Sequence, residues 1–123
     1  MYPRDASKLV FTGQTYRLKK VLEKIAPPFI TSCLNEAKVK PADLDLVCTH
    51  LVSRSTVPIL ADYLKIGLDK IVDTFQIYGN TASTTVPLAL DYAIRNDRVR
   101  EGDLVMLLGM AAGINLSVQL MYL

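Results

Sequence analysis

One imidazole and one carboxamide are the side chains whose types and positions best suit chemistry. His50 is the only histidine in the sequence, and Asn80 stands in a Gly-Asn turn further along the chain. Each follows a segment that we predict to be a β-strand. Ligands of open α/β sheets gather beyond the carboxyl ends of the strands, where loops converge and helix N-termini point. If the two strands are neighbours, about 4.8 Å apart, both side chains can donate hydrogen bonds to one ligand atom.

Both residues also have an ordinary structural interpretation. A lone histidine is more often a surface or interior residue than a catalyst, and Gly-Asn is a common turn because both residues tolerate positive φ. Cys48 lies two residues before His50 and suggests a Cys-His nucleophile. We reject that hypothesis, because a cysteine within an apolar strand is usually inert and side chains two apart on a strand do not approach closely enough for proton transfer.

The composition describes one globular domain of 123 residues, half of them hydrophobic. A net charge of +2 with 21% charged residues lacks the basic excess of nucleic-acid-binding proteins, so we expect no nucleic-acid partner. Two cysteines and one histidine are too few for a zinc site or a disulfide scaffold, and we expect no metal. The N-terminus does not resemble a signal or transit peptide, which predicts a cytoplasmic protein.

The predicted elements bring His50 and Asn80 to one end of a sheet. Apolar residues recur at spacings of three and four along 16–37, and Pro27 and Pro28 within that range predict a kink or two stacked helices. Beyond it we predict a strand at 44–49, a helix that begins near Ser53 or Ser55, a strand at 70–75, a turn at 78–80, a helix at 81–94, and strands at 104–108 and from Ile114 onward. Crossover helices require parallel pairing, so the fold class is α/β: a mixed, mainly parallel sheet with helices on its faces and an antiparallel C-terminal strand.

The end of the chain has two possible interpretations. Residues 104–123 carry no charge, and their length alone would allow a membrane-spanning helix. From Ile114 onward, however, apolar and polar residues alternate, which is typical of a half-buried strand. We therefore predict a strand pair joined by a turn at 109–113 and no membrane partner, with a tail anchor as the alternative.

Several motifs resemble one known family. Around His50, around Tyr78-Gly79-Asn80-Thr81-Ala82-Ser83, and at 86–91 and 102–105, the sequence resembles the C-terminal half of 3-oxoacyl-[acyl-carrier-protein] synthase III of the thiolase superfamily. The resemblance extends from roughly the first helix to the last residue. It implies a thiolase-like half-domain at 15–123, with 1–14 as a linker or edge segment. The family's N-terminal half, which carries the nucleophilic cysteine, is absent from this chain.

The resemblance also implies an activity and its residues. The family transfers an acyl group from coenzyme A to its cysteine and condenses it with a malonyl thioester by decarboxylative Claisen chemistry, in fatty acid or polyketide biosynthesis. His50 and Asn80 would be the catalytic histidine and asparagine. Backbone amides in the turn at Ala111, Ala112 and Gly113 would complete a second oxyanion hole, and Ser53 and Arg54 would contact the carrier protein or coenzyme A. The resemblance implies no bound cofactor, and coenzyme A or carrier-protein thioesters as substrates. The implied partners are the missing half, the acyl carrier protein and a second copy in a homodimer.

Some positions depart from the family pattern and leave alternatives open. Leu51-Val52-Ser53 follows the histidine where the family has Gln-Ala-Asn, and the family's glycine run is reduced to Ala111-Ala112-Gly113. These changes suggest a divergent member with an unusual acyl substrate. The alternatives are a non-condensing acyltransferase, with His50 as general base, and a non-catalytic partner or scaffold half. As a catalytic half-domain, this chain is expected to be inactive alone. We also expect it to associate with itself or with its missing half.

Overall fold

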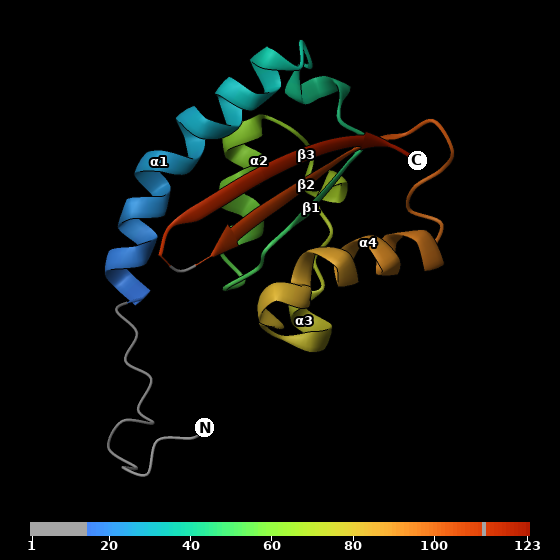
Figure 1. Cartoon of the computed structure of the whole chain (residues 1–123). Helices are drawn as coiled ribbons and strands as arrows, with labels where there is room; N and C mark the ends of the chain where they lie inside the picture. Colours follow the sequence, from blue (N-terminus) through green and yellow to red (C-terminus); the bar gives the residue numbers. More distant parts are fainter. Residues whose placement is uncertain (1–14, 112) are drawn as a thin grey trace, which may run out of the picture.

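A mixed three-stranded sheet organises the molecule. The computed structural model describes residues 15–111 and 113–123, so the predicted linker at 1–14 lies outside the described residues. Strand β1 (Leu46–Thr49) pairs in parallel with the central strand β2 (Leu104–Ala111), which pairs antiparallel with β3 (Asn115–Tyr122). Figure 1 shows this sheet between its helices. The predicted fold class, α/β with an antiparallel C-terminal strand, is confirmed.

Helices pack on both faces of the sheet (Figure 1). Helices α1 (Thr15–Glu36) and α2 (Thr56–Leu64) contribute buried side chains to one core, together with alternate residues of β1 and β2. Helix α4 (Thr85–Arg95) covers the other face, where Ala89 and Ala93 pack against Cys48 and Val105. Because successive side chains of a strand point to opposite faces, alternate residues of β1 and β2 pack into two cores, one on each face of the sheet.

Helix α1 continues through Pro27 and Pro28 as one helix rather than two stacked ones. A proline inside a helix removes one backbone hydrogen bond and crowds the preceding turn. A tertiary contact supports this part of α1, because the hydroxyl of Tyr63 on α2 donates a hydrogen bond to the Pro27 carbonyl at 2.5 Å. The same hydroxyl also contacts the Thr31 hydroxyl.

The predicted strand at 70–75 is wrong in extent. Only Ile71 pairs with β1, through a single parallel bridge to Val47. The chain then turns into the short helix α3 (Phe75–Tyr78), because the Asp73 carboxylate accepts a hydrogen bond from the Phe75 amide at 3.0 Å. A side chain that captures a backbone amide two residues later favours a turn over a ladder. The segment still lies beside β1, as the prediction required.

The last part of the chain forms the predicted strand pair. Residues 104–111 and 115–122 pair along their whole lengths, and side-chain exposure in β3 alternates over most of the strand. Among the helices of the described residues, none combines the length and the apolar character that crossing a membrane requires. The tail-anchor alternative therefore has no helix to support it in this part of the chain.

Candidate functional site

A cleft of about 220 Å³ opens at the carboxyl end of β1. It lies between the start of α4 and the end of the β2–β3 hairpin. The residues that line it are His50, Ala82, Ser83, Val86, Gly109, Met110, Ala111, Asn115, Leu116 and Ser117. The predicted location beyond the carboxyl ends of the parallel strands thus contains a cleft, and His50 is the one ionisable side chain among the described residues that line it.

His50 is fixed by both its backbone and its ring. Its amide donates to the Leu108 carbonyl at 3.1 Å, which continues the parallel pairing one residue beyond β1. Its ring Nδ1 lies 3.2 Å from the Thr85 hydroxyl oxygen at the start of α4. Burial lowers the pKa of His50 below its usual 6.5, and a backbone hydrogen bond with Ala82 opposes the shift. The ring is therefore neutral at pH 7.

The Thr85 hydroxyl links the His50 ring to the preceding turn, and this role of Thr85 was not predicted from the sequence. Its side chain is 1% exposed, and its hydroxyl donates to the Ala82 carbonyl at 2.9 Å. The hydroxyl of Thr81 lies 3.1 Å from the same oxygen. The sequence signal was weak, because threonine at a helix start is usually explained as a cap. Here the hydroxyl faces a histidine that is distant in sequence.

Asn80 lies in the same turn but outside the cleft lining. Its side chain is exposed, and its Oδ1 accepts a hydrogen bond from the Ala82 amide at 2.9 Å. Gly79 (φ +70°) and Ala82 (φ +51°) adopt the left-handed backbone region in this turn. The side chains of Asn80 and Thr85 thus hold the amide and the carbonyl of Ala82, respectively. That His50 and Asn80 meet at one ligand atom stays a prediction.

The last residue of β2, Ala111, lines the cleft, whereas Ala112 lies outside the described residues. Gly113 (φ +76°) is in the turn but does not line the cleft. The predicted oxyanion role of these backbone amides stays a prediction.

The contribution of β3 to the cleft was not predicted from the sequence. Asn115 and Ser117 are polar positions of the alternating pattern in this strand, and the pattern alone does not show that the start of α4 stands opposite them. The Ser117 hydroxyl approaches Gly109 closely, since a Cβ added at Gly109 would lie 2.4 Å from that oxygen. Gly109 therefore leaves room for a hydroxyl in the cleft.

The structure does not bring Ser53 and Arg54 into the cleft. Ser53 bonds to the Ser55 hydroxyl at 2.8 Å before α2, and Arg54 is exposed. Their contact with a carrier protein or coenzyme A stays a prediction.

Cys48, the nucleophile rejected from the sequence, is inert in the structure. Cys48 is fully buried, and this burial raises the pKa of its thiol to about 12, so it stays protonated at pH 7. Across residues 15–111 and 113–123, no three His, Cys, Asp or Glu side chains are grouped so that they could hold a metal ion.

Sequence comparisons place this arrangement among known proteins. The family model "3-Oxoacyl-[acyl-carrier-protein (ACP)] synthase III C terminal" matches residues 34–123. The chain is 38% identical over 88 residues to the β-ketoacyl-[acyl-carrier-protein] synthase III of Synechocystis sp., a match covering 72% of this chain and 27% of that protein. The synthase III of Aquifex aeolicus is 36% identical over 81 residues, covering 66% of this chain and 26% of the relative. The matched part of this chain thus spans about a quarter of the length of these relatives.

Solved structures show the same fold. The crystal structure of 3-oxoacyl-[acyl-carrier-protein] synthase III from Aquifex aeolicus superposes with a TM-score of 0.85 at 29% identity, covering 91% of this chain and 36% of that one. The synthase III from Pseudomonas aeruginosa gives a TM-score of 0.86 at 20% identity, covering 99% of this chain and 38% of that one.

Proposed function

This chain belongs to the 3-oxoacyl-[acyl-carrier-protein] synthase III family, and we propose that it is the C-terminal catalytic half of a condensing acyltransferase. One observation carries the proposal. His50, at the carboxyl end of β1, lines a cleft between the 80–85 turn and the hairpin, within the part of the chain that matches the family. A completing half would supply the cysteine.

The proposed reaction has two steps. The cysteine of the completing half first takes an acyl group from a coenzyme A thioester and releases the thiol. A malonyl thioester then loses carbon dioxide, and its enolate forms a carbon–carbon bond to the acyl carbon while the cysteine leaves as thiolate. Both steps place negative charge on a thioester oxygen. Preorganised hydrogen-bond donors stabilise such an oxygen, and losing one typically costs about 10² to 10³ in rate.

Asn80 is held in a state that suits this role. Because its Oδ1 accepts from the Ala82 amide, the carboxamide orientation is set and its NH₂ group remains available as a donor. Asn80 is exposed in this chain, so a completing half that covers the turn would also shield it from water. A hydrogen bond to a developing oxyanion strengthens when water is excluded.

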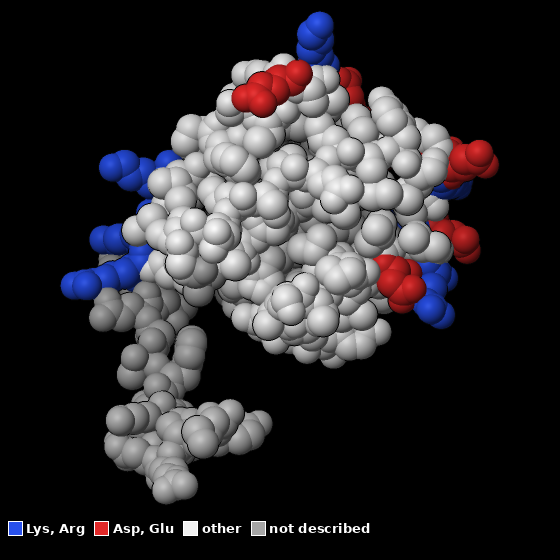
Figure 2. Space-filling view, in the orientation of Figure 1, with Lys and Arg blue, Asp and Glu red and all other residues white. Residues whose placement is uncertain are grey.

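The surface offers a place for that half. Figure 2 shows that the face over β3 and α4 is largely free of charged side chains, which gather at the rim of the view. Exposed apolar side chains include Ile77 on α3 and Ile94 on α4, which are 55% and 50% exposed. A broad uncharged surface suits a stable partner. The proposed partners are the completing half, a second copy of the whole enzyme in a homodimer, and acyl carrier protein or coenzyme A thioesters, in the cytoplasm.

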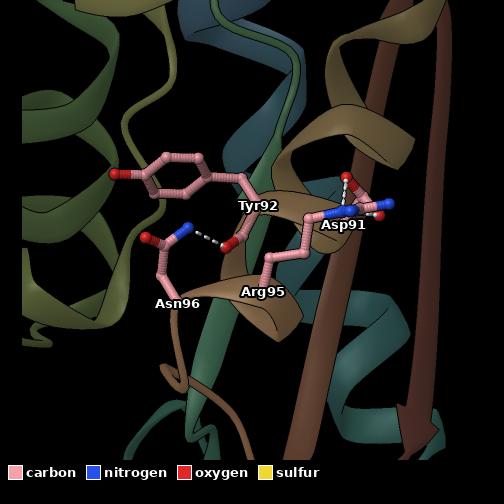
Figure 3. Close-up of polar contacts among 4 residues, drawn as sticks. All are labelled: Asp91, Tyr92, Arg95 and Asn96. Carbon is pink, nitrogen blue, oxygen red and sulfur yellow. Dashed lines mark hydrogen bonds and ion pairs between the residues drawn. The ribbon is translucent and has the colours of Figure 1, made fainter.

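The test combines this chain with the N-terminal half of a synthase III relative and measures malonyl decarboxylation and condensation. Asn80→Ala should lower turnover by about 10² to 10³. Asn96→Ala is the matched control, because Asn96 bonds to the Tyr92 carbonyl at 2.7 Å at the other end of α4 (Figure 3). Acyl transfer without decarboxylation would indicate the non-condensing alternative.

A second candidate is a non-catalytic partner half. The exposure of Asn80 and its place outside the cleft lining favour this interpretation. Unchanged turnover in Asn80→Ala would support it and contradict the catalytic proposal.

A further inference from the structure

The hydrogen bonds behind His50 determine which ring nitrogen carries its proton. We propose that Thr85 is a positioning residue that holds the neutral His50 ring with its proton on Nδ1, so that Nε2 is a proton acceptor at the cleft. The catalytic consequence of this inference rests on the proposed function, but the arrangement of the proton does not.

The Thr85 hydroxyl contacts three polar groups. A hydroxyl group has one hydrogen to donate and two lone pairs to accept with. The Ala82 carbonyl can only accept, and at 2.9 Å it is nearer than the Thr81 hydroxyl at 3.1 Å or His50 Nδ1 at 3.2 Å. The Thr85 hydrogen is therefore used at Ala82.

The direction of the bond to His50 follows. With its hydrogen donated to Ala82, the Thr85 oxygen can only accept from the other two partners. The bond to His50 then requires a hydrogen on Nδ1. A proton on Nε2 instead would set the Nδ1 lone pair against the lone pairs of the Thr85 oxygen. Thr85 is 1% exposed, so water does not compensate for that loss.

The tautomer decides how His50 enters a reaction. His50 lines the cleft, and Nδ1 is engaged by Thr85, so Nε2 is the nitrogen available to a ligand. A neutral ring of this kind accepts a proton at Nε2 before it can donate one there. In this state Asn80, and not His50, would donate to the thioester oxygen, which differs from the expectation that both side chains donate. In acyl transfer, the proton of the attacking thiol, hydroxyl or amine moves to Nε2 as the nucleophile bonds to the acyl carbon. The leaving thiolate then takes that proton back from Nε2.

The position of the proton on the His50 ring can be measured directly in this protein. Because His50 is the only histidine, nitrogen-15 spectra of the labelled chain contain a single imidazole. At about pH 8 the ring is neutral. We expect Nδ1 to show the shift of a protonated ring nitrogen and Nε2 that of an unprotonated one. A proton on Nε2 in the unmodified chain would overturn the proposal, and this measurement needs no variant.

Variants then identify Thr85 as the cause. Thr85→Val keeps the shape but removes the acceptor, and it should lower the ratio of the Nδ1–H to the Nε2–H tautomer by about tenfold, the change that one hydrogen bond of ordinary strength produces. Thr85→Ser should restore the original ratio. Thr81→Val is the matched control and should leave the ratio unchanged, because the Thr81 hydroxyl contacts Thr85 and, in the described structure, makes no hydrogen bond to His50.

The outcomes separate this inference from the proposed function. An unchanged ratio in Thr85→Val would overturn the positioning role, whatever the activity of the two-half protein. A confirmed tautomer with no acyl transfer in that protein would contradict the proposed function and leave the role of Thr85 intact. If both hold, Thr85→Val should lower kcat with little change in KM, because the ring loses its orientation rather than a contact with the substrate.

Discussion

Thr49 and His50 are consecutive residues with opposite surroundings. Successive side chains of a strand point to opposite faces, so His50 shares the α4 face with Cys48, whereas Thr49 shares the opposite face with Val47. His50 has a polar partner in Thr85, but the fully buried Thr49 hydroxyl has none among the described residues. The position of His50 after a strand could be predicted from the sequence. Its partner could not, because Thr85 reaches it only through the packing of α4.

Burial of His50 makes the stability of the chain depend on pH. Its pKa in the folded chain is below the unfolded value of 6.5, mainly because of burial. As the pH falls below 6.5, the unfolded ring binds its proton first and unfolding becomes more favourable. The contribution is therefore present above pH 6.5 and is lost as the pH falls toward the lowered pKa. Urea unfolding across this range should show the loss, and His50→Gln should remove it. A pKa at or above 6.5 in an imidazole titration would contradict the prediction.

The Thr49 hydroxyl is buried without a partner among the described residues. A buried hydroxyl without a partner costs stability, and valine has nearly the same shape without that group. We expect Thr49→Val to raise the free energy of unfolding by about 1 kcal/mol. Thr85→Val is the matched comparison, because Thr85 is as deeply buried but fully bonded, and it should lower the free energy of unfolding. Denaturant unfolding of both variants decides, and a loss of stability in Thr49→Val would show that its hydroxyl has a partner.

Helices and strands with a clear hydrophobic periodicity were predicted well from the sequence, and the segment without one was not. The alternation after Ile114 identified β3, and the spacing of three and four identified α1 to within a residue at each end. The segment at 70–75 has the composition of a strand, yet the Asp73 side chain diverts the backbone into α3 after one bridge. The apolar composition of this segment correctly predicts that residues in it are buried, as Ile71 and Val72 are. It does not predict the side-chain hydrogen bond of Asp73 that competes with strand pairing.

The hairpin turn carries a residue in an unfavourable conformation. Ile114 has φ +52°, in the left-handed region that a β-branched residue rarely adopts, at a cost of about 1 to 2 kcal/mol. The Ile114 side chain is 40% exposed, so its packing contacts offset only part of that cost. Ile114→Asn should therefore raise the free energy of unfolding by about 1 kcal/mol, since asparagine tolerates this region.

A helical isoleucine supplies the control for that measurement. Ile59 on α2 is 46% exposed and has helical φ, so Ile59→Asn relieves no strain and should lower the melting temperature slightly. Equal effects of the two substitutions in thermal unfolding would argue against strain at Ile114.

For the molecule as a whole, the weakly charged face over β3 and α4 is the feature that bears on association. Helix α4 covers the β1 side of its face, while the polar positions Asn115, Ser117 and Gln119 of β3 remain exposed. Figure 2 shows few charges there. A mean hydropathy of +0.25 predicts apolar surface, but it does not say on which face. The position of the apolar surface depends on how α4 packs on the sheet, and the sequence pattern does not determine that packing.

This surface predicts that the isolated chain associates with itself. Ile94 on α4 is 50% exposed, and its burial against a second copy would remove apolar area from water. Sedimentation should show dimers or larger species at micromolar concentration, and the chain should bind the dye ANS. Ile94→Lys should weaken both signals, whereas Ile59→Lys on α2, across the sheet, should leave them unchanged. A monomer that binds no dye would contradict the prediction, because it would mean that the uncharged face is stable in water and needs no partner.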